Sequence, residues 1–136
     1  MKRALGAHRT PDAYRQRSFL ERGIPLPGSS DRPVVAGAPL LGIHDMVNQK
    51  TATGEPFVPA EALTVGQALS AYSAGSAFAS FEERRKGHLA PGMLADFTVL
   101  GADPGMIDRD GLGETAVLAT VVGGDFSHGG DAFVGR

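Results

Sequence analysis

Hydrophobic residues with helical spacing mark two segments in the middle of the chain. From Leu40, the stretch "LLGIHDMVNQK" has apolar residues at positions 40, 43, 46 and 47, which predicts a helix that ends near Lys50. A loop rich in turn residues follows over 51–62. Thr64 then suits a helix N-cap, and one face of the next segment is apolar: Val65, Ala68, Leu69, Tyr72 and Ala79. We predict that residues 64–81 are largely helical.

The second of these helices is rich in small residues between Ser70 and Ser80. Small side chains allow the backbone of a neighbouring segment to approach a helix closely. We therefore expect another segment of the chain to pack tightly against this helix.

The region before residue 40 gives weaker signals. Pro11 suits a first helical turn and Gly23 suits a stop, so residues 11–22, "PDAYRQRSFLER", predict a short surface helix. Residues 24–26 could begin a strand, but the prolines on either side of Leu26 lack backbone donors. Such a segment would pair on limited sides or form the ragged end of a strand.

The last third of the chain has the composition of strands and turns. Pro91 and Gly92 suit a type II turn, and "ADFTVLG" after them predicts a strand over Ala95–Leu100. A second strand is predicted over Val117–Val122, within "TAVLATVVGG". Helices followed by strands indicate an α/β chain with two structural regions and no repeating unit.

Composition restricts the classes of protein to consider. The 136 residues are too few for a whole (β/α)8 barrel, which needs about 250. The 42% hydrophobic and 21% charged residues are typical of a folded globular chain. A net charge of −2 without a basic patch argues against nucleic acid as a partner. The absence of cysteine, of an apolar leader and of any long apolar run favours a cytoplasmic protein without a membrane segment.

The common catalytic motifs are missing from the sequence. It has no G-x-S-x-G, H-E-x-x-H, Walker or Rossmann pattern, and its four histidines stand too far apart for a zinc pair. Asp31 lies in the turn-rich stretch "PLPGSSDRPVV", where an aspartate usually serves local hydrogen bonding. From residue chemistry alone, Asp31 is either a turn residue or one half of a chemical site.

Several segments together resemble a known family. "GSSDRPV", "GIHDMVNQKT", "LTVGQALSAYSAGSAFASFEERRKGHLAPGMLADFTVL" and "VLATVVGGD" occur in the order and at the spacing of the C-terminal end of metal-dependent amidohydrolases. The chain is most similar to the amidohydrolase family 3 branch of that superfamily, from about Tyr14 to Asp125.

The resemblance implies a fold and a chemistry. It implies the C-terminal fragment of a (β/α)8 metal-dependent hydrolase barrel followed by strands of a small composite β-sandwich, with residues 1–84 in the barrel part and 85–136 in the sandwich part. Ile24–Gly28 would be the eighth barrel strand, whose C-terminal end faces the active site. Asp31 would then be both a metal ligand and the catalytic carboxylate that takes a proton from metal-bound water in the hydrolysis of a small amide-like substrate.

Arg32 departs from the common family pattern, which has a small residue after the aspartate. Its guanidinium could bind a substrate carboxylate at the mouth of the active site. Alternatively, Arg32 is a surface arginine paired with a nearby acid. Both interpretations remain open at this point.

The remaining family ligands have no counterpart in this chain. A catalytic zinc, the divalent metal expected for the whole family, takes about three protein ligands and a water. We therefore expect an incomplete enzyme, inactive alone, such as the product of a truncated gene or a misplaced start codon. The alternative is a non-catalytic packing or interaction module. A barrel fragment lacks the neighbours on both sides of its strand, so the apolar faces of residues 14–20 and 40–47 are expected to be poorly covered, with self-association or a weakly stable monomer as the result.

Overall fold

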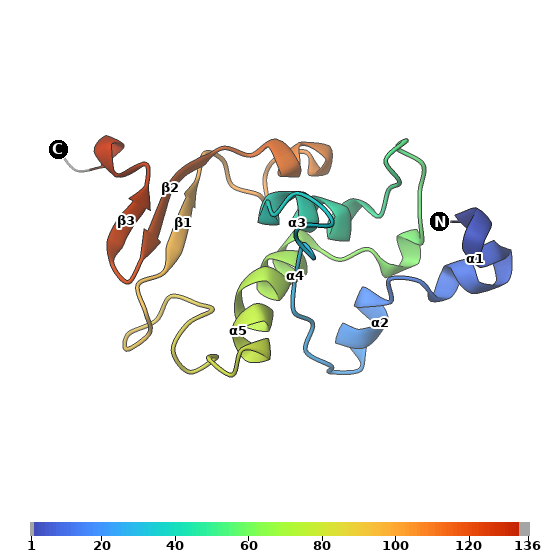
Figure 1. Ribbon diagram of the computed structural model, residues 1–136, viewed down its shortest axis with the longest axis horizontal. Helices are drawn as coiled ribbons and strands as arrows, with labels where there is room; N and C mark the ends of the chain where they lie inside the picture. Colours follow the sequence, from blue (N-terminus) through green and yellow to red (C-terminus); the bar gives the residue numbers. More distant parts are fainter. Residues whose placement is uncertain (1, 134–136) are drawn as a thin grey trace.

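The helical region and the sheet lie at different ends of an elongated molecule. The computed structural model describes residues 2–133, with the N-terminal helices at one end, a central group of helices, and the sheet at the other end (Figure 1). The helices and strands are α1 (Lys2–Arg9), α2 (Gln16–Glu21), α3 (Pro39–Asn48), α4 (Val65–Ser70), α5 (Ser76–Ala79), β1 (Phe97–Leu100), β2 (Val117–Val122) and β3 (Asp125–His128).

The core forms where α3 meets a segment from late in the chain. Ile43 and Val47, both on the predicted apolar stripe of α3, are 3% and 2% exposed. They pack with residues that come from other elements: Leu63, Ala68 and Leu112. Leu112 belongs to the 3-10 segment Arg109–Glu114, which returns from the sheet to cover α3. The helix predicted from Leu40 is therefore confirmed.

The expected exposure of apolar faces is confirmed for one segment and wrong for the other. Tyr14 and Phe19 are 55% and 43% exposed, as expected for residues 14–20. The face of residues 40–47 is instead largely buried, because the 3-10 segment around Leu112 and the start of α4 cover it. Local patterns do not indicate that Arg109–Glu114, a segment from late in the chain, would return to α3.

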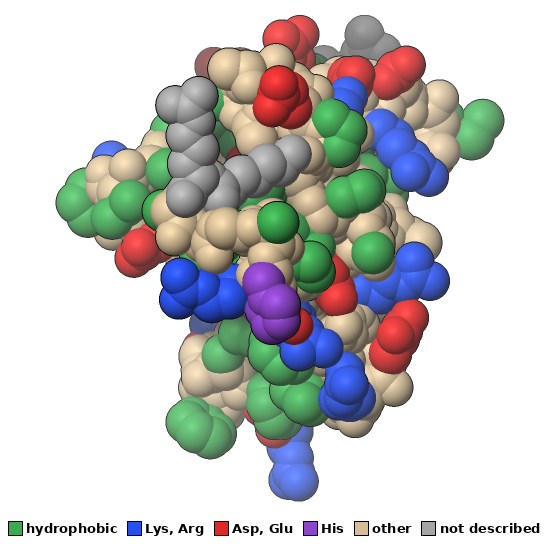
Figure 2. All heavy atoms as spheres, turned by 90° about the vertical axis from the view of Figure 1, so that its right-hand side faces the viewer, with side chains coloured by type: hydrophobic (Ala, Val, Ile, Leu, Met, Phe, Trp, Pro, Cys, Tyr) green, Lys and Arg blue, Asp and Glu red, His purple; other side chains and the backbone are tan. Residues whose placement is uncertain are grey.

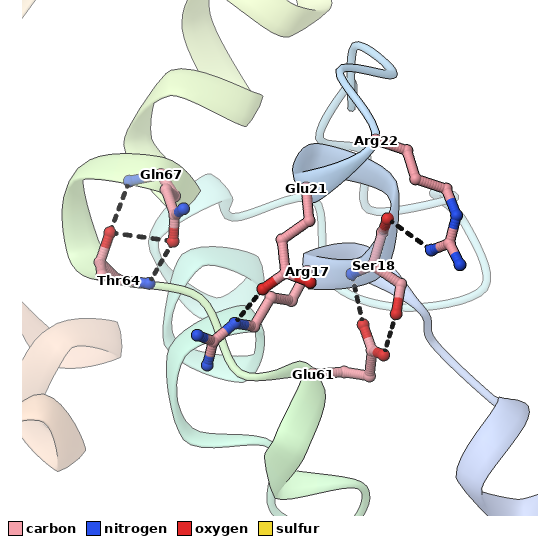
Figure 3. Close-up of polar contacts among 7 residues, drawn as sticks. All are labelled: Arg17, Ser18, Glu21, Arg22, Glu61, Thr64 and Gln67. Atoms are coloured by element: carbon pink, nitrogen blue, oxygen red, sulfur yellow. Dashed lines mark hydrogen bonds and ion pairs between the residues drawn. The ribbon is translucent and has the colours of Figure 1, made fainter.

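The long helix predicted over 64–81 is confirmed and has an irregular centre. Thr64 is its N-cap. The backbone amide of Gln67 donates to Thr64 Oγ1 at 3.2 Å, and the side-chain oxygen Oε1 of Gln67 accepts from the backbone amide of Thr64 at 2.9 Å (Figure 3). Between α4 and α5 the chain forms a π-helical turn, Ala71–Gly75. A π turn holds one residue more than a regular turn, so it rotates the following residues by about 100°. This explains why Ala77 is buried and Ala79, predicted on the apolar face, is exposed.

The helix predicted over 11–22 is divided into two pieces. A 3-10 turn, Thr10–Asp12, precedes α2, and Tyr14 between them has a left-handed φ of 51°. The Tyr14 ring contacts that of Phe57 edge-on, with 5.8 Å between the ring centroids. This aromatic contact across the chain accompanies the break, which the local pattern did not predict.

A buried carboxylate fastens α2 to the loop before α4. Glu61 is 8% exposed, and its two oxygens accept from the Ser18 backbone amide at 2.8 Å and from Ser18 Oγ at 2.5 Å (Figure 3). Ser18 lies in the first turn of α2, where backbone donors have no partner within the helix. The hydrogen bond from Ser18 Oγ is the main cause that lowers the pKa of Glu61.

Charges of both signs cover the end of the molecule that carries α1 and α2. Figure 2 shows Lys and Arg side chains interspersed there with Asp, Glu and hydrophobic ones. Two of the arginines pair along the chain, Arg15 with Asp12 at 3.3 Å and Arg17 with Glu21 at 2.9 Å. Among the described residues, this face therefore has no extended field of one sign.

The sheet is antiparallel with the order β1-β2-β3. The predicted strands 95–100 and 117–122 are observed as β1 and β2, and Phe97 pairs with Val121. The predicted turn is also present: Gly92 has a φ of 87°, and the Met93 amide donates to the Ala90 carbonyl at 3.0 Å. The strand β3 was not predicted. It follows the Gly123–Gly124 turn, where both glycines have a positive φ, as a tight hairpin requires.

The sheet buries few of its apolar side chains. Ala119 and Val121 in β2 are 0% and 3% exposed, but Leu118 and Val122 in the same strand are 46% and 56% exposed. Phe126 in β3 is 42% exposed. The chain is thus a small α/β unit whose helical part has a core and whose sheet remains open.

Candidate functional site

The segment 24–31, here called the Asp31 arm, is extended but is not a strand. The eighth strand expected over Ile24–Gly28 is therefore not formed within the part of the chain that the structure describes. Pro25 and Pro27 have no backbone donor, and the Gly28 amide donates to the carbonyl of Ala71 in the π turn, at 2.8 Å. The arm is bound to a helix where a barrel strand would have neighbouring strands.

Small residues of the helix allow the arm to lie close to it. A Cβ atom added to Gly75 would lie 2.2 Å from the Leu26 carbonyl oxygen, so only glycine fits at this position. The hydroxyl of Ser76 donates to the Gly28 carbonyl at 3.0 Å. The predicted close approach of a neighbouring backbone to residues 70–80 is therefore confirmed, and that neighbour is the Asp31 arm.

Tyr72 lies between the arm and α3. Its hydroxyl donates to the Ser29 carbonyl at 3.1 Å. Cβ atoms added to Gly28 and Gly42 would lie 2.4 Å from Tyr72 Cδ2 and 1.8 Å from its hydroxyl oxygen, so both glycines are needed for the ring to fit. Burial raises the pKa of Tyr72, and the carboxylate of Asp45 raises it further. The phenol therefore stays protonated and remains a donor.

Asp31 is exposed at the end of the arm and has a left-handed φ of 54°. Aspartate and asparagine tolerate this conformation better than most residues. The Asp31 amide donates to Ser29 Oγ at 3.2 Å, and its carbonyl accepts from Val34 at 2.8 Å. These bonds use the backbone of Asp31, while its carboxylate forms no hydrogen bond within residues 2–133 and is accessible to a ligand.

Arg32 is exposed next to Asp31 and folds over its own loop. A Cβ atom on Gly37 would lie 2.8 Å from Arg32 Cδ, so the arginine stem lies against that glycine. Within the described chain Arg32 forms no ion pair with an acid. The two residues singled out in the sequence thus adjoin each other on one exposed turn.

The described residues do not provide a complete metal site. Residues 2–133 contain no group of three or more His, Cys, Asp or Glu side chains that could hold a metal ion. His44, the histidine of α3, is hydrogen-bonded to its neighbour Asp45, with 3.0 Å between Nδ1 and Oδ1. The donor set near Asp31 is a single carboxylate, which does not fit the three protein ligands that a catalytic zinc takes.

The residues that hold the arm were only partly foreseeable. The run of small residues signalled close packing, but nothing singled out Tyr72 as more than one apolar residue of a helical stripe. The pairing of Tyr72 with Gly28 and Gly42, which are 44 and 30 residues away in the chain, depends on the tertiary fold.

Comparison with known proteins identifies the family. Residues 1–128 match the amidohydrolase family, so the chain belongs to it, and the resemblance seen in the sequence is confirmed. The chain is 36% identical over 127 residues to YtcJ of Bacillus subtilis (strain 168), a relative that is named as an amidohydrolase. The match covers 91% of this chain and 24% of the relative.

Two further relatives have more specific names. The N-substituted formamide deformylase of Arthrobacter pascens is 33% identical over 108 residues, covering 79% of this chain and 20% of the relative. The protein LONG AFTER FAR-RED 3 of Arabidopsis thaliana is 32% identical over 123 residues, covering 88% of this chain and 21% of the relative. The chain therefore spans about a quarter or less of the length of these relatives. No solved structure matches it. Within residues 2–133, no helix has the length and apolar character needed to cross a bilayer.

Proposed function

We propose that this chain supplies Asp31 to a hydrolase that cleaves carbon–nitrogen bonds other than peptide bonds. The observation that supports this most directly is the docking of the arm. An extended segment is fixed at residues 26–29, and it ends in a carboxylate that is exposed and has no partner within the described chain. Family membership supports the reaction class.

In this proposal the Asp31 carboxylate acts as a general base and then as an acid. It accepts a proton from the water whose oxygen adds to the substrate carbonyl carbon. It then returns the proton to the nitrogen as the C–N bond breaks, which yields a carboxylic acid and an amine. Members of this family are generally metal-dependent, and a zinc or other divalent ion would need most of its ligands from outside residues 2–133.

Arg32 is the proposed substrate-binding residue. Its position beside Asp31 would allow the guanidinium to bind a carboxylate of a small amide-like substrate in a bidentate manner. The name of the Arthrobacter pascens relative suggests N-substituted formamides as one substrate class to test.

The proposed setting is a barrel with a composite sandwich. Residues 1–84 would contribute the last barrel helices and the eighth-strand segment, and 85–136 the C-terminal strands of the sandwich. Two observations support this layout: the arm is extended without a strand neighbour, and β2 exposes Leu118 and Val122. A covering segment from the rest of such a protein would bury these side chains.

The second candidate is a non-catalytic packing or interaction module that associates with itself or with another chain. Large apolar side chains at the surface favour it, since Phe81, Met106 and Val34 are 93%, 84% and 73% exposed. The incomplete donor set around Asp31 favours it as well.

A chimaera separates the two candidates. The matching quarter of the Bacillus subtilis relative is replaced by this chain, and hydrolysis of small amides, including an N-substituted formamide, is measured with added zinc. Asp31→Asn should lower kcat by about 100-fold or more, because an amide cannot accept the proton of the water. Asparagine tolerates the left-handed φ of 54° at this position, so the turn should persist.

The matched control is Glu55→Gln, which removes an exposed carboxylate from the loop before α4 and should leave kcat unchanged. The chain alone should show no turnover. An active chimaera whose rate is unaffected by Asp31→Asn would mean that Asp31 is only a turn residue and would favour the non-catalytic module.

A further inference from the structure

We infer that Tyr72, assisted by Ser76, is a positioning residue that fixes the backbone of the arm and thereby the direction in which Asp31 is presented. This inference rests on the proposed function, in which Asp31 is the catalytic carboxylate. Tyr72 touches neither a substrate nor Asp31 itself in this assignment and acts through Ser29.

Ser29 connects Tyr72 to Asp31. Its carbonyl accepts from the Tyr72 hydroxyl at 3.1 Å, and its own hydroxyl accepts from the Asp31 amide at 3.2 Å. One residue is therefore held from the helix on one side and holds the Asp31 backbone on the other. A shift of Ser29 would be passed directly to Asp31.

The residue before Ser29 is held from the same helix. Gly28 donates its amide to the Ala71 carbonyl at 2.8 Å and accepts at 3.0 Å from the Ser76 hydroxyl, whose single proton is shared with the Ala71 carbonyl at 3.1 Å. Both polar groups of this glycine are thus bound, so residues 28 and 29 together form three hydrogen bonds with one short stretch of helix, one as donor and two as acceptors. An extended segment normally obtains such bonds from adjacent strands.

The π turn makes this arrangement possible. Within it the Ser76 amide bonds to the Ala71 carbonyl, five residues earlier. The wide turn leaves that carbonyl accessible, so it also accepts from Gly28. π turns inside α-helices often occur at functional sites. Here the turn lies at the contact with the arm: it contains Tyr72 and is followed directly by Ser76.

A purely space-filling role for Tyr72 can be separated from a positioning role. The ring fills the slot between Gly28 and Gly42, whereas the hydroxyl alone bonds to Ser29. Tyr72→Phe keeps the ring and removes only the hydroxyl. Tyr14→Phe is the matched control, because Tyr14 is the other tyrosine of the chain and its ring packs edge-on against Phe57.

The first experiment uses the full chain and follows amide hydrogen exchange by NMR. Tyr72→Phe should speed exchange of the Gly28 and Asp31 amides by about 3- to 10-fold, the effect of losing one hydrogen bond. The Val121 amide in β2 should exchange at its original rate. In Tyr14→Phe, the amides of Gly28, Asp31 and Val121 should all exchange at their original rates. Ser76→Ala should also speed exchange of the Gly28 amide. This variant replaces Tyr72→Phe in the experiment if Tyr72→Phe fails to fold. Equal acceleration at Val121 would indicate a merely structural role and overturn the inference.

The second experiment uses the active chimaera. Tyr72→Phe should lower kcat by about 10-fold with little change in KM, because substrate binding does not involve the hydroxyl and the orientation of the base does. If Asp31→Asn reduces kcat while Tyr72→Phe does not, the inference is wrong and the proposed function stands. If neither variant changes kcat, the proposed function itself fails.

Discussion

The Asp31 arm and the sheet are both extended, but the arm forms its hydrogen bonds with a helix and the strands form theirs with one another. Within residues 2–133 the arm pairs with no strand, and it is held by a hydrogen bond to the Ala71 carbonyl and by bonds from the Tyr72 and Ser76 hydroxyls. The strands β1 and β2 have a regular backbone ladder, yet Leu118 and Val122 stay exposed. The sheet thus combines a backbone ladder with exposed apolar side chains, whereas the arm, in which Ile24 is 46% exposed, depends on its hydrogen bonds to the helix.

The same contrast separates the regions that surround them. The helices around α3 enclose a core in which Leu112 is fully buried. The sheet buries little besides Ala119 and Val121. Since the burial of apolar surface dominates folding energetics, we expect the helical region to provide most of the stability of the chain.

The largest expected effect compares two leucines. Leu112→Ala should lower the free energy of unfolding by about 2–5 kcal/mol, because it empties a fully buried position in the helical core. Leu118→Ala, at a position that is 46% exposed in β2, should cost less than about 1 kcal/mol. Urea denaturation followed by circular dichroism measures both. Equal losses would show that the sheet contributes as much as the core and would remove the contrast.

A smaller effect tests the contact between arm and helix. Gly75→Ala should destabilise the chain by about 1–3 kcal/mol, since its Cβ would lie 2.2 Å from the Leu26 carbonyl. Gly66→Ala is the matched control in α4, where an added Cβ meets nothing within 4 Å. It should stabilise by about 0.5–1 kcal/mol through helix propensity. Thermal unfolding compares the two, and a stabilising Gly75→Ala would mean that the arm is not tightly packed.

The smallest effect concerns the attachment of α2. Glu61→Gln should cost about 1 kcal/mol at pH 7, because the charged acceptor of two hydrogen bonds from Ser18 is lost. The pKa of Glu61 is lowered in the folded chain, so its contribution is present above the ordinary value of 4.5 and is lost as the pH falls through the folded-state pKa.

Urea titrations at a series of pH values check this sign. The difference in stability between the native chain and Glu61→Gln should be largest at neutral pH and should shrink under acid conditions. A difference that stays constant down to pH 3 would show that Glu61 acts through packing and not through its charge.

Local patterns predicted the elements whose signals lie within a few residues. The Thr64 cap, the α3 stripe and the Pro91–Gly92 turn depend on neighbours in sequence, and all are present. The hairpin to β3 has a local signal as well, because the Gly-Gly pair before Asp125 suits a two-residue turn between strands.

Long-range contacts account for what local patterns missed. Glu61 is buried because Ser18, 43 residues away, donates to it. The strand expected over Ile24–Gly28 is not formed: the Ile24 amide donates to the Phe19 carbonyl, and the Gly28 amide donates to the Ala71 carbonyl of the helix. For the site, the sequence predicted Asp31 and Arg32 through family resemblance, and their adjacency on an exposed turn is observed. Their catalytic and binding roles remain predictions.

The π turn at Ala71–Gly75 has a consequence for insertions and deletions. Removing one residue there would allow the helix to continue with regular α-helical bonds and would rotate the part after it by about 100°. The Ser76 hydroxyl would then turn away from Gly28, and the Ala71 carbonyl would return to its helical partner. The helix would become more regular while the arm lost its support, so a deletion that improves local structure would impair the segment that ends at Asp31.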